Sequence, residues 1–295
     1  ESAREKGMYL AGHKPLAVSG MEAVAAGQRS IEHAFLFIWE CYPGIEGLRK
    51  LEEIRAAYTH KTRRKMIEQH DAQQCAELQA TMVASGTAFV PTHTTRKLDA
   101  YSLNPEYRND PRLKYVPAPL RTIWLADANG MAERAGDEGY SSYRDFYEFG
   151  IEQTGRAHAA GVTVLAGTDA PDSFAFPGFG LHDELGHLSQ AGLSPLDVLR
   201  TATVEPARFL GLEGEAGVIA AGARADIVLL RENPLSDIEA VRSVDTVVLA
   251  GRVYDRDRLD AILSQAEGTA SHWSMWPKFT WQALRSPILR AQFAD

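Results

Sequence analysis

Helix-like stretches and short apolar runs alternate along the first two-thirds of the chain in a repeating order. A helix-like stretch ends in glycine, a short apolar run follows, and a polar residue closes the unit. The runs span residues 8–12, 28–32, 87–92 and 162–168, and they follow Gly7, Gly27, Gly86 and Gly161. Glycine just after a helix takes the left-handed conformation that a C-cap needs. Short, largely unalternated apolar runs are typical of strands buried on both faces.

The starts of the expected helices carry matching signals. Ser19 precedes Glu22 at the spacing of a capping box. Ser194 followed by Pro195 is typical of an N-cap with proline in the first helical position. Alternation of helices with parallel strands predicts an α/β fold, which is either a (β/α)₈ barrel or a doubly wound sheet.

The polar residues that close the four units favour the barrel. These residues are His13, His33, His93 and Asp169. In a barrel the carboxyl ends of all strands converge on one mouth, which holds the active site. An open sheet gathers its ligand near only some of its strands. No GxGxxG motif follows any of the runs, so a nucleotide-binding sheet is further disfavoured.

The pattern changes after Ala207. Residues 217–231 and 244–254 are rich in Val, Ile and Leu with turn residues between them, which predicts strands of a small β-structure outside the barrel. The tail from Leu259 is first helix-like and then rich in tryptophan. Within the barrel, the long stretch 95–149 is either a lid or specificity insertion or packed helix, and the sequence leaves both open.

Composition and charge narrow the class of protein. The chain has 295 residues, of which 45% are hydrophobic and 24% charged, as expected of a globular domain. The formal net charge of -8 argues against a nucleic-acid partner. No run is long and apolar enough to predict a membrane span. Cys41 and Cys75 form no CxxC motif, and we expect neither a disulfide framework nor a structural zinc knuckle.

The residue types at three of the strand ends suit a metal ion. Imidazole is a good ligand for zinc and similar ions, and a carboxylate completes such sites. Taken alone, a histidine at a strand end is more often a satisfied polar residue than a ligand. His13, His33 and Asp169 are singled out because their local contexts match a protein family.

The stretches SIEHA (30–34) and LAGTDAP (165–171), with a strand-end histidine one unit earlier, resemble the amidohydrolase superfamily. The imidazolonepropionase-like and prolidase-like members are the most similar. Residues 181–211 look like the last barrel helices of that group. Residues 214–235 look like the segment in which the chain of these proteins leaves the barrel and enters a small β-sandwich. The resemblance runs from residue 1 to about residue 255.

This resemblance implies a distorted (β/α)₈ barrel and a metal-dependent hydrolase of C–N bonds in small-molecule, amide-type substrates. His13 and His33 would be metal ligands after strands five and six. Asp169, after strand eight, would be a metal ligand and the general base and acid. His93, after strand seven, would be a substrate contact. The implied cofactor is a divalent metal, with zinc as the first choice.

The resemblance also implies that only strands five to eight are present. The HxH pair that the family carries after strand one does not occur in the chain. We therefore expect residues 1–210 to be the C-terminal half of the barrel, 211–256 part of a composite β-sandwich, and 257–295 a C-terminal helix and tryptophan-containing tail. Unpaired strand edges would favour a homo-oligomer or completion by an N-terminal segment.

Such a chain would be catalytically weak or inactive by itself. A non-catalytic partial barrel, acting as a binding or assembly piece, is the alternative. A phosphate-handling barrel is disfavoured because the segment after strand eight is apolar and aromatic rather than glycine-rich. The sequence does not indicate a cellular compartment.

Overall fold

The computed structural model describes residues 2–50 and 58–286. Its elements in the first half of the chain are α1 (Ser2–Glu5), β1 (Leu10–Gly12), α2 (Gly20–Ala25), β2 (Gln28–Glu32), α3 (Phe35–Glu40), α4 (Ile45–Arg49), α6 (His60–Glu68), α7 (Ala72–Ser85), β3 (Ala88–Val90), α8 (His93–Tyr101), α9 (Pro105–Arg108), the 3₁₀ helix η1 (Pro111–Tyr115) and α10 (Ala118–Ala159). The second half contains α11 (Phe179–Gln190), α12 (Pro195–Thr201), α13 (Val204–Phe209), β4 (Ile227–Leu230), the 3₁₀ helix η2 (Ile238–Arg242), β5 (Val244–Leu249), β6 (Arg252–Tyr254), α14 (Arg256–Ser271) and α15 (Met275–Arg285).

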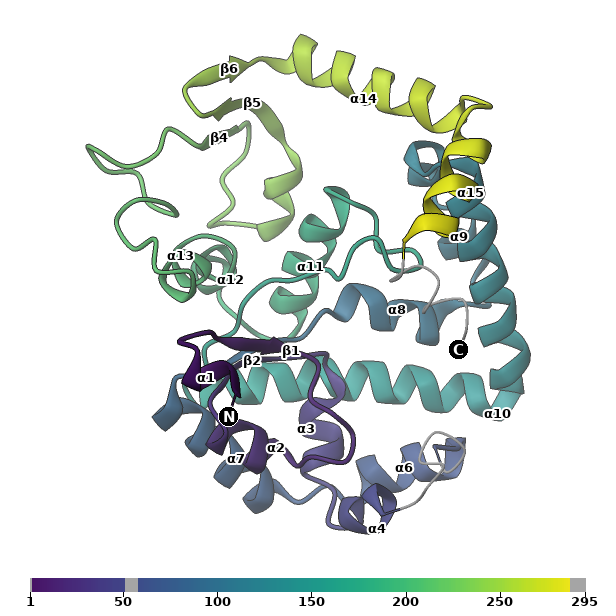
Figure 1. Cartoon of the computed structure of the whole chain (residues 1–295), viewed down its shortest axis with the longest axis vertical. Coiled ribbons are helices and arrows are strands. Elements are labelled where there is room, and N and C mark those ends of the chain that lie inside the picture. Colours follow the sequence, from purple (N-terminus) through teal and green to yellow (C-terminus); the bar gives the residue numbers. More distant parts are fainter. Residues whose placement is uncertain (1, 51–57, 287–295) are drawn as a thin grey trace.

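A parallel sheet lies at the centre of the first part of the chain. Strands β1, β2 and β3 pair in that order and in parallel. The expected fourth strand is reduced to a single parallel bridge between Phe89 and Val164. Backbone hydrogen bonds from Phe89 to Thr163 and from Leu165 to Phe89, 2.8 and 2.9 Å long, still hold this segment beside β3. The helices lie around these strands (Figure 1), and the α/β fold is confirmed.

The local signals in the sequence act as predicted. Ser19 and Glu22 form the capping box at the start of α2. Ser194 caps α12, with Pro195 in its first turn. Gly7, Gly27, Gly86 and Gly161, which follow the helices, all have positive φ, between 65° and 94°. These caps end each helix where the next strand must begin.

The stretch 95–149 is helical. It contributes α9, η1 and most of α8 and α10, and α10 bends at Gly136, whose φ is 51° and ψ is -171°. Trp124 of α10 is buried against Phe174 and Phe176, which follow the fourth strand segment. This insertion is therefore packed onto the segment that follows the fourth strand through a separate apolar cluster.

The last part of the chain forms a separate antiparallel sheet of β4, β5 and β6. Helices α14 and α15 follow it and reach back to η1 and α10 (Figure 1). Trp273, Trp276 and Trp281 in this tail are between 50% and 74% exposed. Among the described residues, no helix combines the length and apolar character that crossing a membrane requires.

The main core lies between the parallel sheet and helices α7, α10, α11 and α12. It contains Phe89, Met82, Ala157, Leu188 and Val198 among its buried side chains. Interiors of this kind are close-packed, so the removal of side-chain volume leaves a cavity.

We predict that Leu188→Ala lowers the free energy of unfolding by about 2–5 kcal/mol, because Leu188 is 0% exposed in this core. The matched change Leu210→Ala, at a position 66% exposed, should alter it by less than about 0.5 kcal/mol. Urea denaturation of both variants measures the difference. Equal effects of the two changes would contradict this assignment of the core.

Candidate active site

The first two strand ends bring two histidines together. His13 follows β1 and His33 follows β2, and their Nε2 atoms are 3.4 Å apart. The two rings stack with centroids 4.3 Å apart. The carboxylate of Glu32 joins them, and the ligand atoms of the three residues all lie within 4.8 Å of one another. Two imidazoles and a carboxylate at this spacing are a donor set that suits a divalent metal ion.

His33 is held as a neutral ring. Burial, with the nearby charges of Arg96 and His13, lowers the pKa of His33 to about 3. Its Nδ1 lies 2.7 Å from the hydroxyl of Thr92. When Nδ1 carries the ring proton and donates it to Thr92, Nε2 keeps its lone pair and faces His13. Metal-binding histidines characteristically use their second nitrogen in this way.

Three strand ends share an uncommon backbone conformation. His33, Thr92 and Asp169 have φ values of 76°, 49° and 56°. Residues other than glycine rarely enter this left-handed region, and each such residue costs about 1–3 kcal/mol. The chain therefore turns sharply at each of these strand ends, and the neighbouring contacts must compensate for the strain.

Glu184 of α11 supplies such contacts at Thr92. Its buried carboxylate accepts hydrogen bonds from the backbone amides of His93 and Thr94, at 3.0 and 2.8 Å. It also accepts a hydrogen bond from the hydroxyl group of Thr94 at 2.7 Å. Burial raises the pKa of Glu184 to about 7, although these hydrogen bonds oppose the shift. Hydrogen bonds to Glu184 in α11, far along the chain, thus fix the turn that places Thr92 beside His33.

A second buried carboxylate fixes the loop after His13. Glu40, at the end of α3, lies 3.1 Å from the Lys14 ammonium and 2.6 Å from the Arg49 guanidinium. It also accepts a hydrogen bond from the backbone amide of Gly20 at 2.6 Å. These contacts hold the segment that carries His13 against the same helix that follows His33.

Asp169 lies at the site but outside the group of three converging ligand atoms. Burial raises its pKa, and the negative charge of Asp172 adds to the shift. His13 and Arg96 act in the opposite direction, which shows that Asp169 lies within electrostatic reach of both.

The structure does not bring His93 to the histidine pair. Its side chain is 0% exposed and its Nε2 lies 3.0 Å from the hydroxyl of Thr154 in α10. The ring packs edge-on against Tyr147 and His187. Burial lowers the pKa of His93 to about 3, so the ring is neutral. In this structure His93 occupies the core between α8, α10 and α11 rather than a position facing a substrate.

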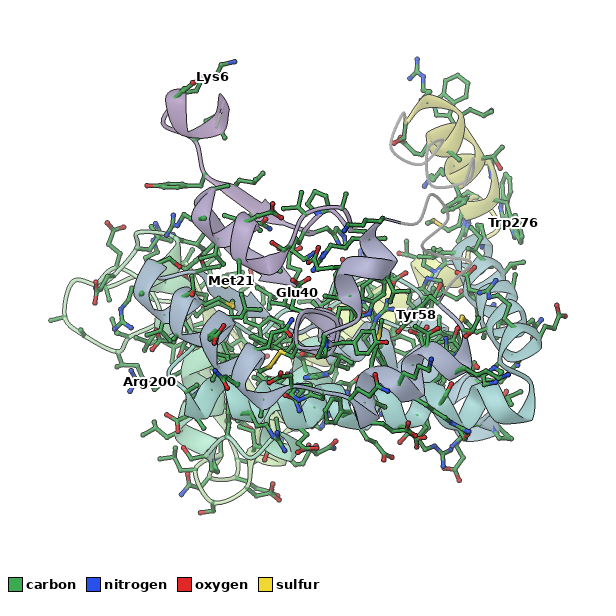
Figure 2. All side chains as sticks on the ribbon, turned by 90° about the horizontal axis from the view of Figure 1, so that it is seen from below. Lys6, Met21, Glu40, Tyr58, Arg200 and Trp276 are labelled. Carbon is green, nitrogen blue, oxygen red and sulfur yellow. A yellow bond between two sulfur atoms is a disulfide. The ribbon has the colours of Figure 1, made fainter. Side chains whose placement is uncertain are left out.

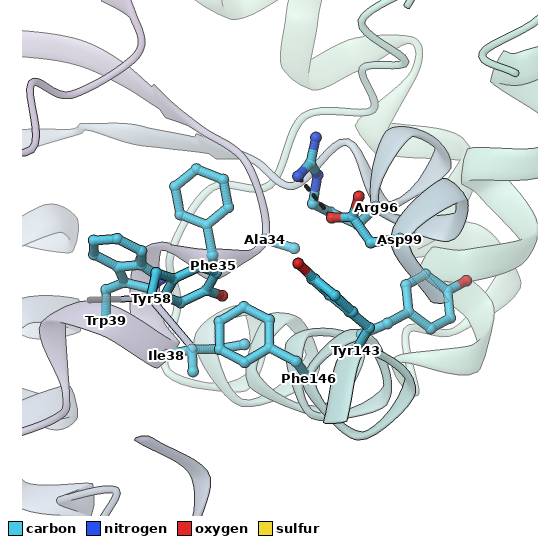
Figure 3. Close-up of a pocket in the computed structure, with 10 residues that line it drawn as sticks. Ala34, Phe35, Ile38, Trp39, Tyr58, Arg96, Asp99, Tyr143 and Phe146 are labelled. Atoms are coloured by element: carbon cyan, nitrogen blue, oxygen red, sulfur yellow. Dashed lines mark hydrogen bonds and ion pairs between the residues drawn. The ribbon is translucent and has the colours of Figure 1, made fainter. Parts of the chain in front are cut away.

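A cleft with a volume of about 600 Å³ opens beside the histidine pair. His13 and Glu32 line one part of it, and Phe35, Trp39 and Arg96 line another. An adjoining side pocket is mostly aromatic (Figure 3), with walls formed by Phe35, Trp39, Tyr58, Tyr143, Phe146 and Tyr147. A cleft of this size with few polar groups is typical of small-molecule sites.

Arg96 and Lys14 are the cations among the residues that line this cleft. Arg96 pairs with Asp99 at 2.9 Å, as Figure 3 shows. Burial alone would lower the pKa of Arg96, but Asp99, Asp172, Tyr58 and Asp169 raise it. The guanidinium is therefore a fixed positive charge between the aromatic walls and Asp169.

Sequence reasoning missed Glu32, Thr92 and Arg96. Glu32 and Thr92 each directly precede a histidine that was singled out, so their positions at strand ends were available as a signal. Arg96 lies within α8, and no local motif marks it. Figure 2 shows that side chains from many segments of the chain crowd together in the interior of the molecule.

The comparison with known families gives the class of the protein. Residues 1–254 match the model of the amidohydrolase family. The chain therefore belongs to the amidohydrolase family, and the resemblance inferred from its motifs is confirmed.

Two curated relatives match parts of the chain. An uncharacterized protein of Mycobacterium tuberculosis is 30% identical over 136 residues, which are 45% of this chain and 35% of that protein. The imidazolonepropionase of Rubrobacter xylanophilus is 55% identical over 42 residues, which are 14% of this chain and 10% of the enzyme. These matches thus span about a third or less of the relatives' own lengths.

Two solved structures share the fold. Bottromycin amidohydrolase superposes with a TM-score of 0.66 at 21% identity, covering 92% of this chain and 55% of that one. A Xaa-Pro dipeptidase with bound methionine in its active site superposes with a TM-score of 0.52 at 20% identity, covering 86% and 46%. The chain therefore spans about half the length of these amidohydrolase structures.

We predict that Thr92→Val weakens zinc binding about 10–100-fold, because His33 loses the partner that orients its ring. Thr92→Ser keeps the hydroxyl and should keep most of the affinity. Isothermal titration with zinc, under non-reducing conditions, compares both variants with the parent chain. If Thr92→Val bound zinc as tightly as Thr92→Ser, Thr92 would have no orienting role.

Proposed function

We propose that this chain carries part of the active site of a metal-dependent hydrolase that cleaves C–N bonds in small amide-type substrates. The observation that supports this most strongly is the convergence of the His13 and His33 Nε2 atoms at neighbouring strand ends. The neutral state of the buried His33 ring adds to it. Membership of the amidohydrolase family is consistent with this chemistry.

His13 and His33 would hold the metal, with Glu32 and Asp169 as the adjacent carboxylates. Zinc is the ion we favour, since two imidazoles with carboxylates suit it. When bound, such an ion lowers the pKa of water and polarises a carbonyl group. The low pKa of His33 keeps its ring in the form that can donate a lone pair.

Asp169 would move the protons of the reaction. A carboxylate beside the reacting water accepts its proton as general base and returns it to the leaving nitrogen as general acid. The burial that raises the pKa of Asp169 favours this second step, because the protonated acid is then easier to form. The electrostatic effects of His13 and Arg96 on the Asp169 carboxylate support this role.

The cleft would bind and orient the substrate. The aromatic side pocket would take an apolar or aryl group and exclude water from it. Arg96 would lie beside the polar part of the substrate, where its fixed charge favours a carbonyl or carboxylate oxygen. This assignment makes an aryl or apolar amide the expected substrate class.

The complete site would need more than these residues. We propose that residues 1–210 are the C-terminal half of a (β/α)₈ barrel, with strands five to eight, that 211–256 are part of a composite β-sandwich, and that 257–295 are a C-terminal helix and tryptophan-containing tail. Residues 287–295 lie outside the described part of the chain. A second copy or an N-terminal segment would supply the remaining ligands. The exposed side chains Met8, Tyr9 and Leu10 at the β1 edge support such an association, since they are 54–75% exposed.

We predict that the chain binds about one zinc ion under non-reducing conditions and that His33→Ala abolishes this binding. His158→Ala, a matched change on α10 outside the site, should leave it intact. Metal content after dialysis and zinc titration measure both. Retention of zinc by a folded His33→Ala variant would overturn the histidine pair as the metal centre.

We further predict that Asp169→Asn lowers amide hydrolysis about 10²–10⁴-fold, because the general base is lost. Asparagine tolerates the left-handed backbone at this position, so the fold should be preserved. A panel of aryl amides and dipeptides, assayed alongside the surface change Asp197→Asn, tests this. Equal, measurable rates in the two variants would exclude Asp169 as the base. Zinc binding without any hydrolysis, even when a segment that supplies the remaining ligands is added, would favour a binding or assembly role.

A further inference from the structure

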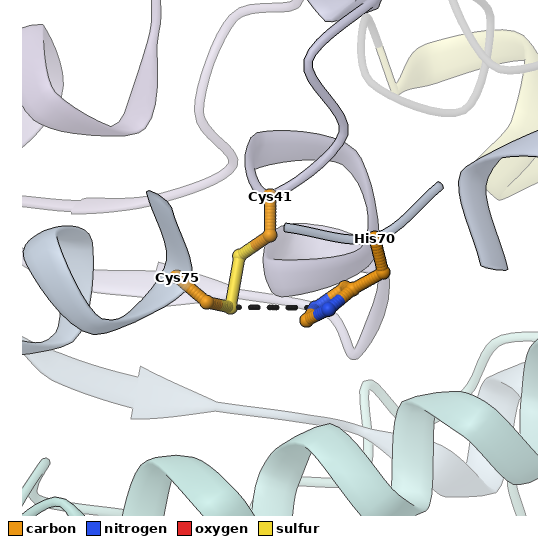
Figure 4. Close-up of side chains that lie close together, drawn as sticks. All are labelled: Cys41, His70 and Cys75. Atoms are coloured by element: carbon orange, nitrogen blue, oxygen red, sulfur yellow. Dashed lines mark hydrogen bonds between the residues drawn. A yellow bond between two sulfur atoms is a disulfide. The ribbon is translucent and has the colours of Figure 1, made fainter. Parts of the chain in front are cut away.

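A second cluster of metal-ligating side chains lies outside the candidate active site (Figure 4). Cys41 and Cys75 form a disulfide, with Cα atoms 4.9 Å apart, a pairing that the expectation of no disulfide framework did not foresee. His70 joins them, with its Nε2 3.5 Å from the Sγ of Cys75. The ligand atoms of the three residues lie within 4.8 Å of one another.

The backbone around the three residues is fixed independently of the disulfide. Cys41 is the C-cap of α3, and its backbone carbonyl accepts a hydrogen bond from the backbone amide of Asp71 at 2.7 Å. The side-chain amide of Gln74 donates to the carbonyl of Glu40 at 2.6 Å. Since Asp71 is the N-cap of α7, the end of α3 and the start of α7 are joined by hydrogen bonds as well as by sulfur. The three side chains therefore stay together when the disulfide is reduced.

The surroundings suit thiolate ligands. Cys41 and Cys75 are 0% and 3% exposed. Cys75 lies near the start of α7, where the helix dipole stabilises a negative charge. The His70 ring packs edge-on against Phe149 of α10, with centroids 5.1 Å apart, which fixes the plane of the imidazole.

A buried polar group faces the cluster and supports a further occupant. Gln153 of α10 is 0% exposed, and its Oε1 lies 4.0 Å from the Sγ of Cys75. Its Nε2 has no hydrogen-bond partner among the described residues. Leaving such a group unsatisfied costs about 1–3 kcal/mol, so it favours a state in which the cluster holds an ion with its own water ligand.

We propose that Cys41, His70 and Cys75 form a redox-gated zinc site. The disulfide is the metal-free, oxidised state. A dithiol reductant transfers two electrons to the S–S bond, giving two thiols while the reductant becomes a disulfide. Zinc then binds the two thiolates and the imidazole, the two thiol protons pass to solvent, and water or the Gln153 oxygen takes the fourth position. A small disulfide oxidant reverses the process and releases the ion.

This site is independent of the histidine pair in its chemistry. Two thiolates and an imidazole suit zinc, whereas the histidine pair offers imidazoles and carboxylates. The two sites are nevertheless joined through α3, which begins two residues after His33 and ends at Cys41.

Cobalt binding tests the proposal, because thiolate ligands give a sulfur-to-cobalt charge-transfer absorption that histidines and carboxylates do not. The chain is reduced with a phosphine, which competes weakly for metal, and titrated with Co²⁺ alone. We expect the band to appear and saturate in the reduced chain and to be absent from the oxidised chain, since Co²⁺ at His13 and His33 gives no such band. Cys41→Ser and Cys75→Ser should lose the two-thiolate band.

His70→Asn should weaken cobalt binding at least about 10-fold while His158→Asn does not. Protection of both thiols from alkylation by a small excess of zinc gives a second measurement that needs no variant. Absence of the band from a reduced chain that circular dichroism shows to be folded would overturn the proposal. So would unfolding on reduction that zinc does not prevent, or equal affinities of the two histidine variants. None of these outcomes bears on zinc at His13 and His33, which is measured in the oxidised chain.

Discussion

The hydrogen bond between Thr92 and His33 is the contact on which the arrangement of the site depends. It joins the ends of β2 and β3 at the point where both residues have left-handed backbones. Glu184 holds the Thr92 turn from α11, and Glu40 holds the loop after His13 from α3. The buried Glu184 carboxylate thus helps to compensate for the left-handed backbone at Thr92, which by itself would cost about 1–3 kcal/mol, while Glu40 fixes the loop that carries His13. The helices around the sheet therefore cover the core and also provide the hydrogen bonds that hold these turns.

The parts of the fold that could be predicted from sequence are those set by local chemistry. Glycine after a helix and a capping box before one act within a few residues, so Gly27, Gly86 and Ser19 marked the boundaries correctly. The same is true of the strand ends, where His13 and His33 meet as neighbours. Parallel strands bring their carboxyl ends to one edge whatever lies between them, which is why spacing along the chain sufficed.

The parts that could not be predicted depend on contacts between distant segments. The pairing of Cys41 with Cys75 requires the end of α3 to meet the start of α7, across 34 residues. The placement of His93 is set by α10 and α11 on either side of it, and a strand-end position alone does not reveal which way the ring turns. The weak fourth strand is similar, because only one bridge at Val164 survives where the sequence has a full apolar run.

The return of the C-terminal helices onto the insertion has a consequence for how the chain is made. Lys114 of η1 pairs with Glu267 of α14 at 3.0 Å, and α15 lies against α10 (Figure 1). A ribosome that adds about 5–20 residues per second needs roughly 8–30 seconds to cover the roughly 150 residues between these partners. During that interval the insertion has emerged but its last neighbours have not. Chaperones that shield nascent apolar surfaces would therefore meet this region before the tail arrives to cover it.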